Sequence, residues 1–80
     1  MELRVLNYFL AIAREQSIVH AAESLNLSQP TLSTQIKNLE KELGKQLFIR
    51  GTKGTRKVTL TEEGMILRKR AEEILDLVRR

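Results

Sequence analysis

Apolar residues recur at intervals of three and four along several parts of the chain, which is the spacing of amphipathic helices. The first such part predicts a helix over residues 2–15 with one buried stripe, made of Leu3, Leu6, Phe9, Leu10 and Ala13. Ser17 is a favourable N-cap for a second, shorter helix over residues 18–25. Its inner face would consist of Ile18, Ala21, Ala22 and Leu25. The two alanines there would allow a neighbouring helix to approach closely.

Capping signals at both ends predict a third helix over residues 28–43. Ser28 is a helix N-cap, and Pro30 falls in the first turn, where its missing N–H would have had no partner anyway. Gly44 follows the last apolar position and favours the left-handed conformation that ends helices. The core-facing positions would be Leu32, Ile36, Leu39 and Leu43. Asn26 tolerates the left-handed conformation that ends helices, and Asn26 and Leu27 make a tight connection between the second and third helices. Such a closely spaced pair is typical of a helix-turn-helix.

The pattern changes after the third helix. Residues 46–50 and 56–61 have the composition of short strands, and the glycines of the intervening GTKGT permit a hairpin turn. Thr61 is a favourable N-cap for a fourth helix that continues to the end of the chain. The order of elements predicts a mainly α winged helix-turn-helix, in which the hairpin is the wing. We expect residues 1–60 to form this domain and residues 61–80 to form a long linker or dimerisation helix.

Composition limits the classes of function. The 80 residues suit one small domain, and the net charge of +4 favours an anionic partner such as nucleic acid. The sequence has no cysteine and a single histidine, His20, so we expect neither a metal site nor a cofactor. No nucleophile stands in a recognisable motif with a base, which argues against an enzyme. No apolar stretch is long enough to span a membrane, and we expect a cytoplasmic protein with no membrane partner.

The polar side of the third helix carries side chains suited to DNA. Its N-terminal residues would form an exposed tip, and this end enters the major groove in helix-turn-helix proteins. The Gln29 amide can pair with adenine, and the methyl groups of threonine can meet thymine, whereas a lysine suits phosphate. The candidate contacts on this face are Ser28, Gln29, Thr31, Ser33, Thr34 and Lys37. The alternative is a solvated face whose hydroxyls only cap the helix, and the acidic Glu40 and Glu42 fit that alternative.

The second basic feature is the segment of residues 45–57, which contains no acid. Its cationic residues are Lys45, Arg50, Lys53, Arg56 and Lys57. A loop with Lys53 and Arg56 beside a groove-facing helix would reach the flanking phosphate backbone or the minor groove. The alternative is an ordinary solvated turn.

Together these segments resemble a known family. The run AAESLNLSQPTLSTQIKNLEKELGKQLFIR, followed by VTLTEEG, is similar to the DNA-binding domain of bacterial LysR-type transcriptional regulators. The resemblance implies a winged domain that reads double-stranded promoter DNA with dyad symmetry. It implies recognition contacts from Ser28, Gln29, Pro30, Ser33 and Thr34. It further implies that Arg50 and the basic wing hold the DNA backbone.

Three positions depart from the family pattern. Thr34 stands where arginine is common, so one strong guanine or phosphate contact is missing or moved. Val19 stands where a hydroxyl residue is common, which removes a phosphate contact expected from the second helix. The wing GTKGTRK is longer than usual, so Lys53 and Arg56 have no individual counterparts.

The last helix carries a candidate dimer seam. Its apolar residues are spaced four, three and four, as in a coiled coil, and are Leu67, Ala71, Ile74 and Val78. The alternative is that this stripe packs on the first helix of the same chain. The family resemblance favours a homodimer, and it implies a small-molecule effector bound by a further domain. Because the predicted helix is still continuing at Arg80, we expect this chain to be part of a longer regulator.

Two other functions remain open at this level. A winged helix that binds protein would show no salt-dependent affinity for DNA. A non-specific nucleoid binder would bind DNA without sequence preference, but it would need lysine or arginine where Gln29 and Ser33 stand.

Overall fold

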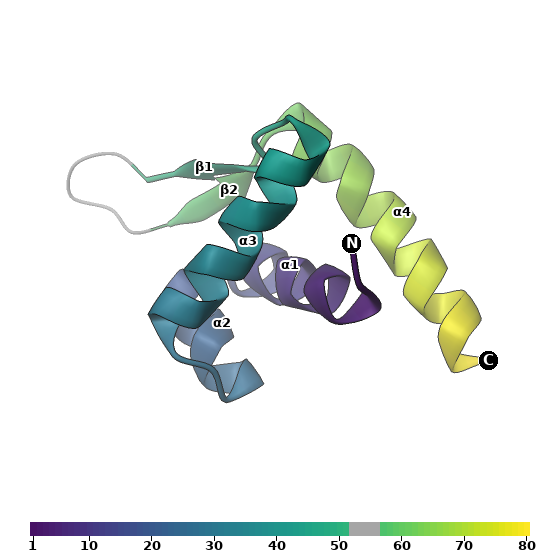
Figure 1. Ribbon diagram of the computed structural model, residues 1–80, viewed down its shortest axis with the longest axis horizontal. Coiled ribbons are helices and arrows are strands. Elements are labelled where there is room, and N and C mark those ends of the chain that lie inside the picture. The colour runs from purple at the N-terminus through teal and green to yellow at the C-terminus, as the bar shows by residue number, and fades with distance from the viewer. Residues whose placement is uncertain (52–56) are drawn as a thin grey trace.

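The computed structural model of the 80-residue chain describes residues 1–51 and 57–80. The elements follow the predicted order (Figure 1). They are α1 (Leu3–Glu15), α2 (Ile18–Leu25), α3 (Gln29–Leu43), β1 (Phe48–Arg50), β2 (Val58–Leu60) and α4 (Glu62–Arg79). The mainly α winged helix-turn-helix is therefore confirmed. Both strands are shorter than expected, and of the predicted GTKGT turn only Gly51 lies within the described residues.

Helix boundaries follow from local capping chemistry. The hydroxyls of Ser17, Ser28 and Thr61 each accept a hydrogen bond from the backbone N–H three residues further on. Each cap thereby satisfies one of the N–H groups that a helix leaves free at its start. At the C-terminal ends of α2 and α3, Asn26 (φ 57°) and Gly44 (φ 68°) adopt the left-handed conformation. All five of these predicted caps are confirmed.

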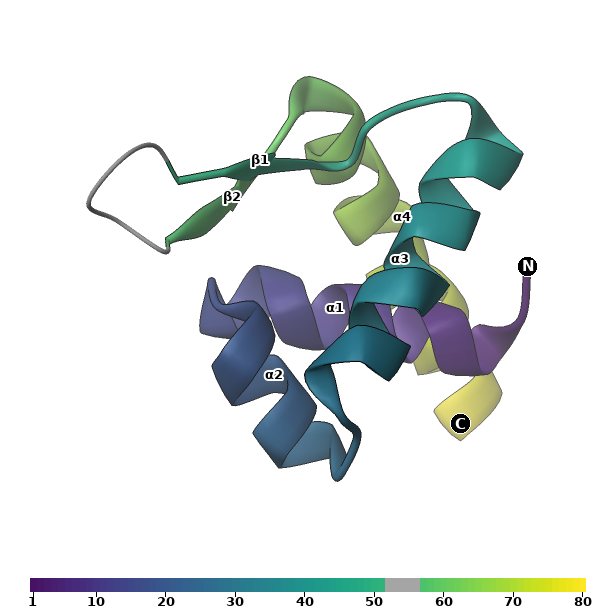
Figure 2. The same cartoon turned by 60° about the vertical axis from the view of Figure 1, so that its left-hand side comes forward.

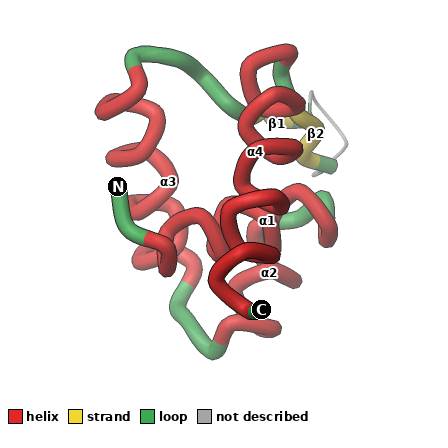
Figure 3. The backbone as a smooth tube through the Cα atoms, turned by 90° about the vertical axis from the view of Figure 1, so that its right-hand side faces the viewer, coloured by secondary structure: helices red, strands yellow, loops and turns green. Residues whose placement is uncertain are grey.

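The core is built around α1, which contacts α2, α3, α4 and β2. Figure 2 shows α2 and α3 packed together beside it, and in Figure 3 α3 and α4 lie apart with α1 in contact with both. The largest fully buried side chains are Phe9, Ile12, Leu32, Ile36, Leu39 and Leu47. The rings of Phe9 and Phe48, with centroids 5.2 Å apart and planes tilted by 44°, join α1 to the first strand.

The buried face of α1 is wider than the single stripe that the spacing predicted. Val5, Ala11 and Ile12 are buried, whereas Leu3 is 46% exposed. The reason is that α1 has neighbours on several sides, so one stripe cannot serve them all. Leu43 is also 37% exposed, because α3 runs past its other core contacts in its last turn, where Leu43 instead lines an apolar groove with Leu47 and Leu67.

The two strands form an antiparallel ladder in which Phe48 faces Leu60 and Arg50 faces Val58. Phe48 and Val58 are buried, while Arg50 is exposed at the far end of β1. The backbone N–H of Val58 also donates to the carbonyl of Gln16 at the end of α1, over 3.0 Å. This bond fixes the start of β2, opposite Arg50, to the end of α1.

Candidate nucleic-acid interface

The N-terminal tip of α3 is exposed, as the sequence predicts. Ser28, Gln29, Pro30 and Thr31 all lie at the surface. The Ser28 hydroxyl accepts from the Thr31 N–H over 3.2 Å and donates to the Thr31 hydroxyl over 2.8 Å. These two side chains therefore cap the helix. Within the described part of the chain the Gln29 amide has no hydrogen-bond partner, so all of its donors and acceptors face solvent.

Further along α3, the polar face continues opposite the core. Leu32, Ile36 and Leu39 are buried on one side of the helix. Thr34 and Lys37 are exposed on the other side, and Ser33 is half-buried at the boundary. Residues four apart lie on one helix face, so Gln29, Ser33 and Lys37 form a single polar stripe.

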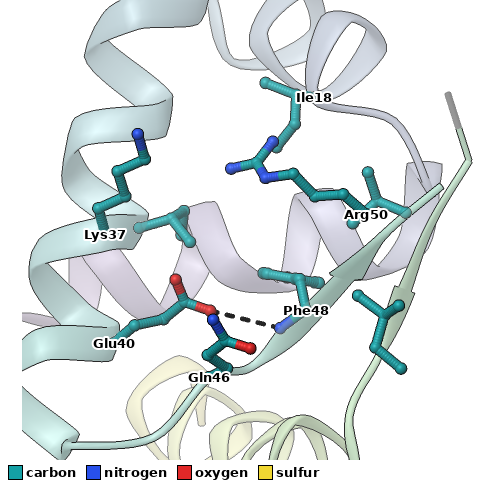
Figure 4. A pocket seen from close by; sticks show the side chains of 9 residues that line it. Ile18, Lys37, Glu40, Gln46, Phe48 and Arg50 are labelled. Carbon is teal, nitrogen blue, oxygen red and sulfur yellow. Dashed lines mark hydrogen bonds between the residues drawn. The ribbon is translucent and has the colours of Figure 1, made fainter. Parts of the chain in front are cut away.

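A groove of about 480 Å³ separates α3 from the hairpin (Figure 4). Its lining residues are Ile18, Ile36, Lys37, Glu40, Gln46, Phe48, Ile49, Arg50 and Val58. Lys37 extends from α3 and Arg50 from β1 on opposite sides of the opening (Figure 4). Neither cation forms an ion pair with any residue in the ranges 1–51 and 57–80. Beside the polar stripe the groove thus presents two cations that form no ion pair within these ranges, and one carboxylate, that of Glu40. The cations are suited to a phosphate.

The structure corrects the interpretation of Glu40 as a solvated residue. Its side chain is half-buried, and one carboxylate oxygen accepts the backbone N–H of Leu47 over 2.7 Å and that of Phe48 over 3.4 Å. No local pattern in the sequence indicates these bonds, because the donors lie in the next element of the chain. Glu42 is exposed as expected, and it pairs with the amino group of Met1 at 2.9 Å.

Two predicted wing contacts, Lys53 and Arg56, lie outside the described residues. Of the other cations in this basic segment, Lys45, Arg50 and Lys57 are exposed. Val19, at the position where the family commonly has a hydroxyl, is half-buried on α2.

The predicted dimer seam is divided by the fold. Ala71 is fully buried and Leu67 packs against the core, so these two residues hold α4 to the body of the chain. Ile74 (41%) and Val78 (59%) are exposed. Outside the predicted seam, Leu75 is buried and three further apolar residues of α4 are exposed, namely Met65, Ile66 and Leu77. Leu67 and Ala71 therefore pack within the same chain, as the alternative expects, while Ile74 and Val78 stay at the surface.

Other kinds of site find no support in the described structure. Between residues 1–51 and 57–80, no three His, Asp or Glu side chains come together as metal ligands. Within the same ranges, no helix has the length and apolar character needed to cross a membrane.

The chain has a helix-turn-helix with an exposed polar tip, and a two-stranded hairpin follows it and carries Arg50 into the adjoining groove. These features place it in the class of winged helix-turn-helix proteins. The more specific assignment comes from the sequence. The profile of the bacterial regulatory helix-turn-helix proteins of the lysR family matches residues 3–65. The chain belongs to this family, which consists of regulatory proteins and not of enzymes.

Curated relatives agree with this assignment. The transcriptional regulator BsdA of Bacillus subtilis is 52% identical over 75 residues, which cover 94% of this chain and 25% of BsdA. The chain thus spans about a quarter of the length of this regulator.

Solved structures agree in fold. The DNA-binding domain of BenM, a regulator of Acinetobacter baylyi, in complex with benA site 1 DNA matches with a TM-score of 0.91 and 48% identity. That match covers 99% of this chain and 88% of the BenM domain. The CbnR DNA-binding domain in complex with DNA matches with a TM-score of 0.91 and 38% identity, over 100% of this chain and 88% of the CbnR domain.

Proposed function

We propose that the chain binds double-stranded DNA in a sequence-specific manner, as the DNA-binding domain of a bacterial LysR-type transcriptional regulator. One observation supports this most directly. The exposed tip of α3 presents a neutral amide that has no hydrogen-bond partner among the described residues, and Lys37 and Arg50 line the adjoining groove without an ion pair among those residues. Neutral hydrogen-bonding groups read base edges, while cations hold the phosphate backbone. Both BenM and CbnR have DNA-binding domains of this fold that were solved with DNA.

The proposed docking places α3 in the major groove with its N-terminal end toward the bases. Gln29 is the main base-reading residue, because a free amide can pair in two places with adenine. Ser33 and Thr34 contact bases or thymine methyl groups next to it. Lys37 and Arg50, on the two sides of the groove between α3 and the hairpin, hold the phosphate backbone of one DNA strand.

The remaining contacts come from the ends of this surface. The first turn of α3, with Ser28, Pro30 and Thr31, lies against the DNA backbone, where the positive end of the helix dipole and the hydroxyl groups suit a phosphate. Lys53 and Arg56 of the wing reach the flanking backbone or the minor groove.

We further propose that two copies bind a site with dyad symmetry. The exposed apolar residues of α4, Ile66, Ile74, Leu77 and Val78, offer a surface for self-association. Ile74, Leu77 and Val78 are spaced by three and four residues and so share one helix face. An exposed apolar patch on one face marks an interaction site. Leu67 and Ala71 of the predicted seam support this surface from within. The effector domain of the longer regulator and its location in the cytoplasm are further parts of this proposal.

Fluorescence anisotropy tests the proposed function. A duplex is first enriched from random DNA by repeated selection on the 80-residue chain, and its shuffled version serves as the control. Binding to both is then measured at two salt concentrations. We expect tighter binding to the selected duplex and weaker binding to both as the salt concentration rises.

Either of two outcomes would refute the proposal. Equal affinity for the two duplexes would indicate a backbone binder of the nucleoid type. Absence of binding at low salt would indicate a module that binds protein.

A further inference from the structure

Residues 46–48 are hydrogen-bonded to both α3 and the start of α4, and they lead into β1, the first strand of the wing. From the side of α3, the Glu40 carboxylate accepts the N–H groups of Leu47 and Phe48. From the side of α4, the Thr61 hydroxyl donates to the Gln46 carbonyl over 2.7 Å, and the Thr61 N–H donates to the Leu47 carbonyl over 3.0 Å. The start of β1 is therefore held from two directions by hydrogen bonds to its backbone.

Glu40 lies on the same face of α3 as the polar stripe of Gln29, Ser33 and Lys37. It follows Lys37 by three residues and Ser33 by seven, and both spacings put side chains on one face of a helix. The strand that Glu40 holds carries Arg50 two residues after Phe48. In Figure 4 the dashed bond from Glu40 to Phe48 closes the lower end of the groove, and Lys37 and Arg50 lie toward its upper end. The bonds that Glu40 makes therefore link the helix that carries Lys37 to the strand that carries Arg50.

We propose that Glu40 is a positioning residue for sequence-specific DNA binding: it sets the wing, and Arg50 with it, at a fixed place relative to the base-reading face of α3. This inference rests on the proposed function. A carboxylate that accepts backbone N–H groups makes strong, geometrically defined hydrogen bonds. A supporting group of this kind keeps the residues that contact the ligand in their correct relative positions, although it does not touch the ligand itself.

The charge of Glu40 makes this role distinguishable from a purely structural one. The Glu40 carboxylate lines the groove between α3 and the hairpin and repels the phosphates of any duplex, so its neutralisation favours DNA binding in general. Loss of a fixed wing, however, weakens only the complex that needs Arg50 and the α3 face in register. On the selected duplex the two effects have opposite signs, whereas on the shuffled duplex only the charge effect acts. A mere loss of folded protein would instead lower both affinities by the same factor.

The test compares Glu40→Gln with Glu42→Gln. Both substitutions remove one negative charge from α3, but Glu42 is exposed and holds no part of the wing. The affinities for the selected and shuffled duplexes are measured by anisotropy. Amide hydrogen exchange of Leu47 and Phe48 is followed in the absence of DNA. Glu40→Asp, which keeps the charge but has a shorter side chain, is the second variant if Glu40→Gln does not fold.

We expect the ratio of selected to shuffled affinity to fall about tenfold in Glu40→Gln, the loss typical of one hydrogen bond to a charged group. Faster exchange at Leu47 and Phe48 should accompany this loss, and Glu40→Asp should show both effects. Glu42→Gln should keep the wild-type ratio and exchange rates.

An unchanged ratio in Glu40→Gln or Glu40→Asp would overturn the inference, as would equal losses on both duplexes. Failure of the proposed function is recognised separately, because there the wild-type chain itself would not prefer the selected duplex.

Discussion

Replacement of Gly64 by alanine tests how tightly the linker helix is seated on the start of the wing. Gly64 is buried in the first turn of α4, and a Cβ atom there would overlap the backbone carbonyl of Leu47 and lie 2.9 Å from the Leu60 side chain. The carbonyl cannot easily yield, because it accepts the Thr61 N–H over 3.0 Å. Overpacking of this kind costs about 1–3 kcal/mol, whereas alanine gains about 1 kcal/mol over glycine from helix propensity.

Because a backbone atom is involved, the upper end of the overpacking range applies. Gly64→Ala should then lose about 2 kcal/mol of folding free energy net of the propensity gain. For a domain of this size, that loss lowers Tm by roughly 10 °C. Thermal unfolding followed by circular dichroism measures the shift.

Gly44→Asn is the matched control for Gly64→Ala. At Gly44 a Cβ atom would meet nothing within 4 Å, and asparagine tolerates the left-handed conformation (φ 68°). This variant should stay within a few degrees of the wild-type Tm. If Gly64→Ala were as stable as the wild type, helix propensity would outweigh the contact, and α4 would not be held against Leu47 in the way described.

Three further predictions concern the tip of α3 and the outer face of α4. Gln29→Ala should lose about 1–3 kcal/mol of binding free energy on the selected duplex and relax the preference at one base position. Lys37→Ala should weaken binding to all duplexes alike and reduce the dependence of affinity on salt concentration. Equal effects on both duplexes in each variant would contradict this division. Ser28→Ala should lower stability by about 1 kcal/mol through loss of the helix cap, and an unchanged Tm would show that the cap is unimportant. Leu77→Glu should abolish self-association in sedimentation at high micromolar concentration without lowering Tm, since Leu77 is 67% exposed, and an unchanged self-association constant would place the dimer contact elsewhere.

Local chemistry made much of this fold predictable from the sequence. Caps such as Ser17, Ser28 and Thr61 act on N–H groups only three residues away, and Asn26 and Gly44 act on their own backbone angles. Signals of such short range are complete within the sequence itself. They define both ends of α2 and α3, and hence the helix-turn-helix and the position of its exposed tip.

The remaining features depend on contacts between elements. The role of Glu40 arises from N–H groups seven and eight residues away in the next strand, and the need for glycine at position 64 arises from the carbonyl of Leu47. Spacing along a helix shows which residues share a face, but not how many neighbours that face meets. For this reason Ala11 and Ile12 of α1 were missed as core residues.

One face of α4 is buried in its own chain and another is exposed, an arrangement that suits binding by two copies because a single copy makes few base contacts. Each good bidentate contact to a base supplies about 1–3 kcal/mol of discrimination, whereas specific sites are typically preferred by about 4–10 kcal/mol. With Gln29 as its one amide at the tip of α3, and hydroxyls beside it, a single copy falls short of that preference. Two copies on a dyad double the number of contacts. Because Ala71 and Leu75 hold α4 to its own chain while Ile74, Leu77 and Val78 stay exposed, the helix can join a second copy without taking any residue from the core.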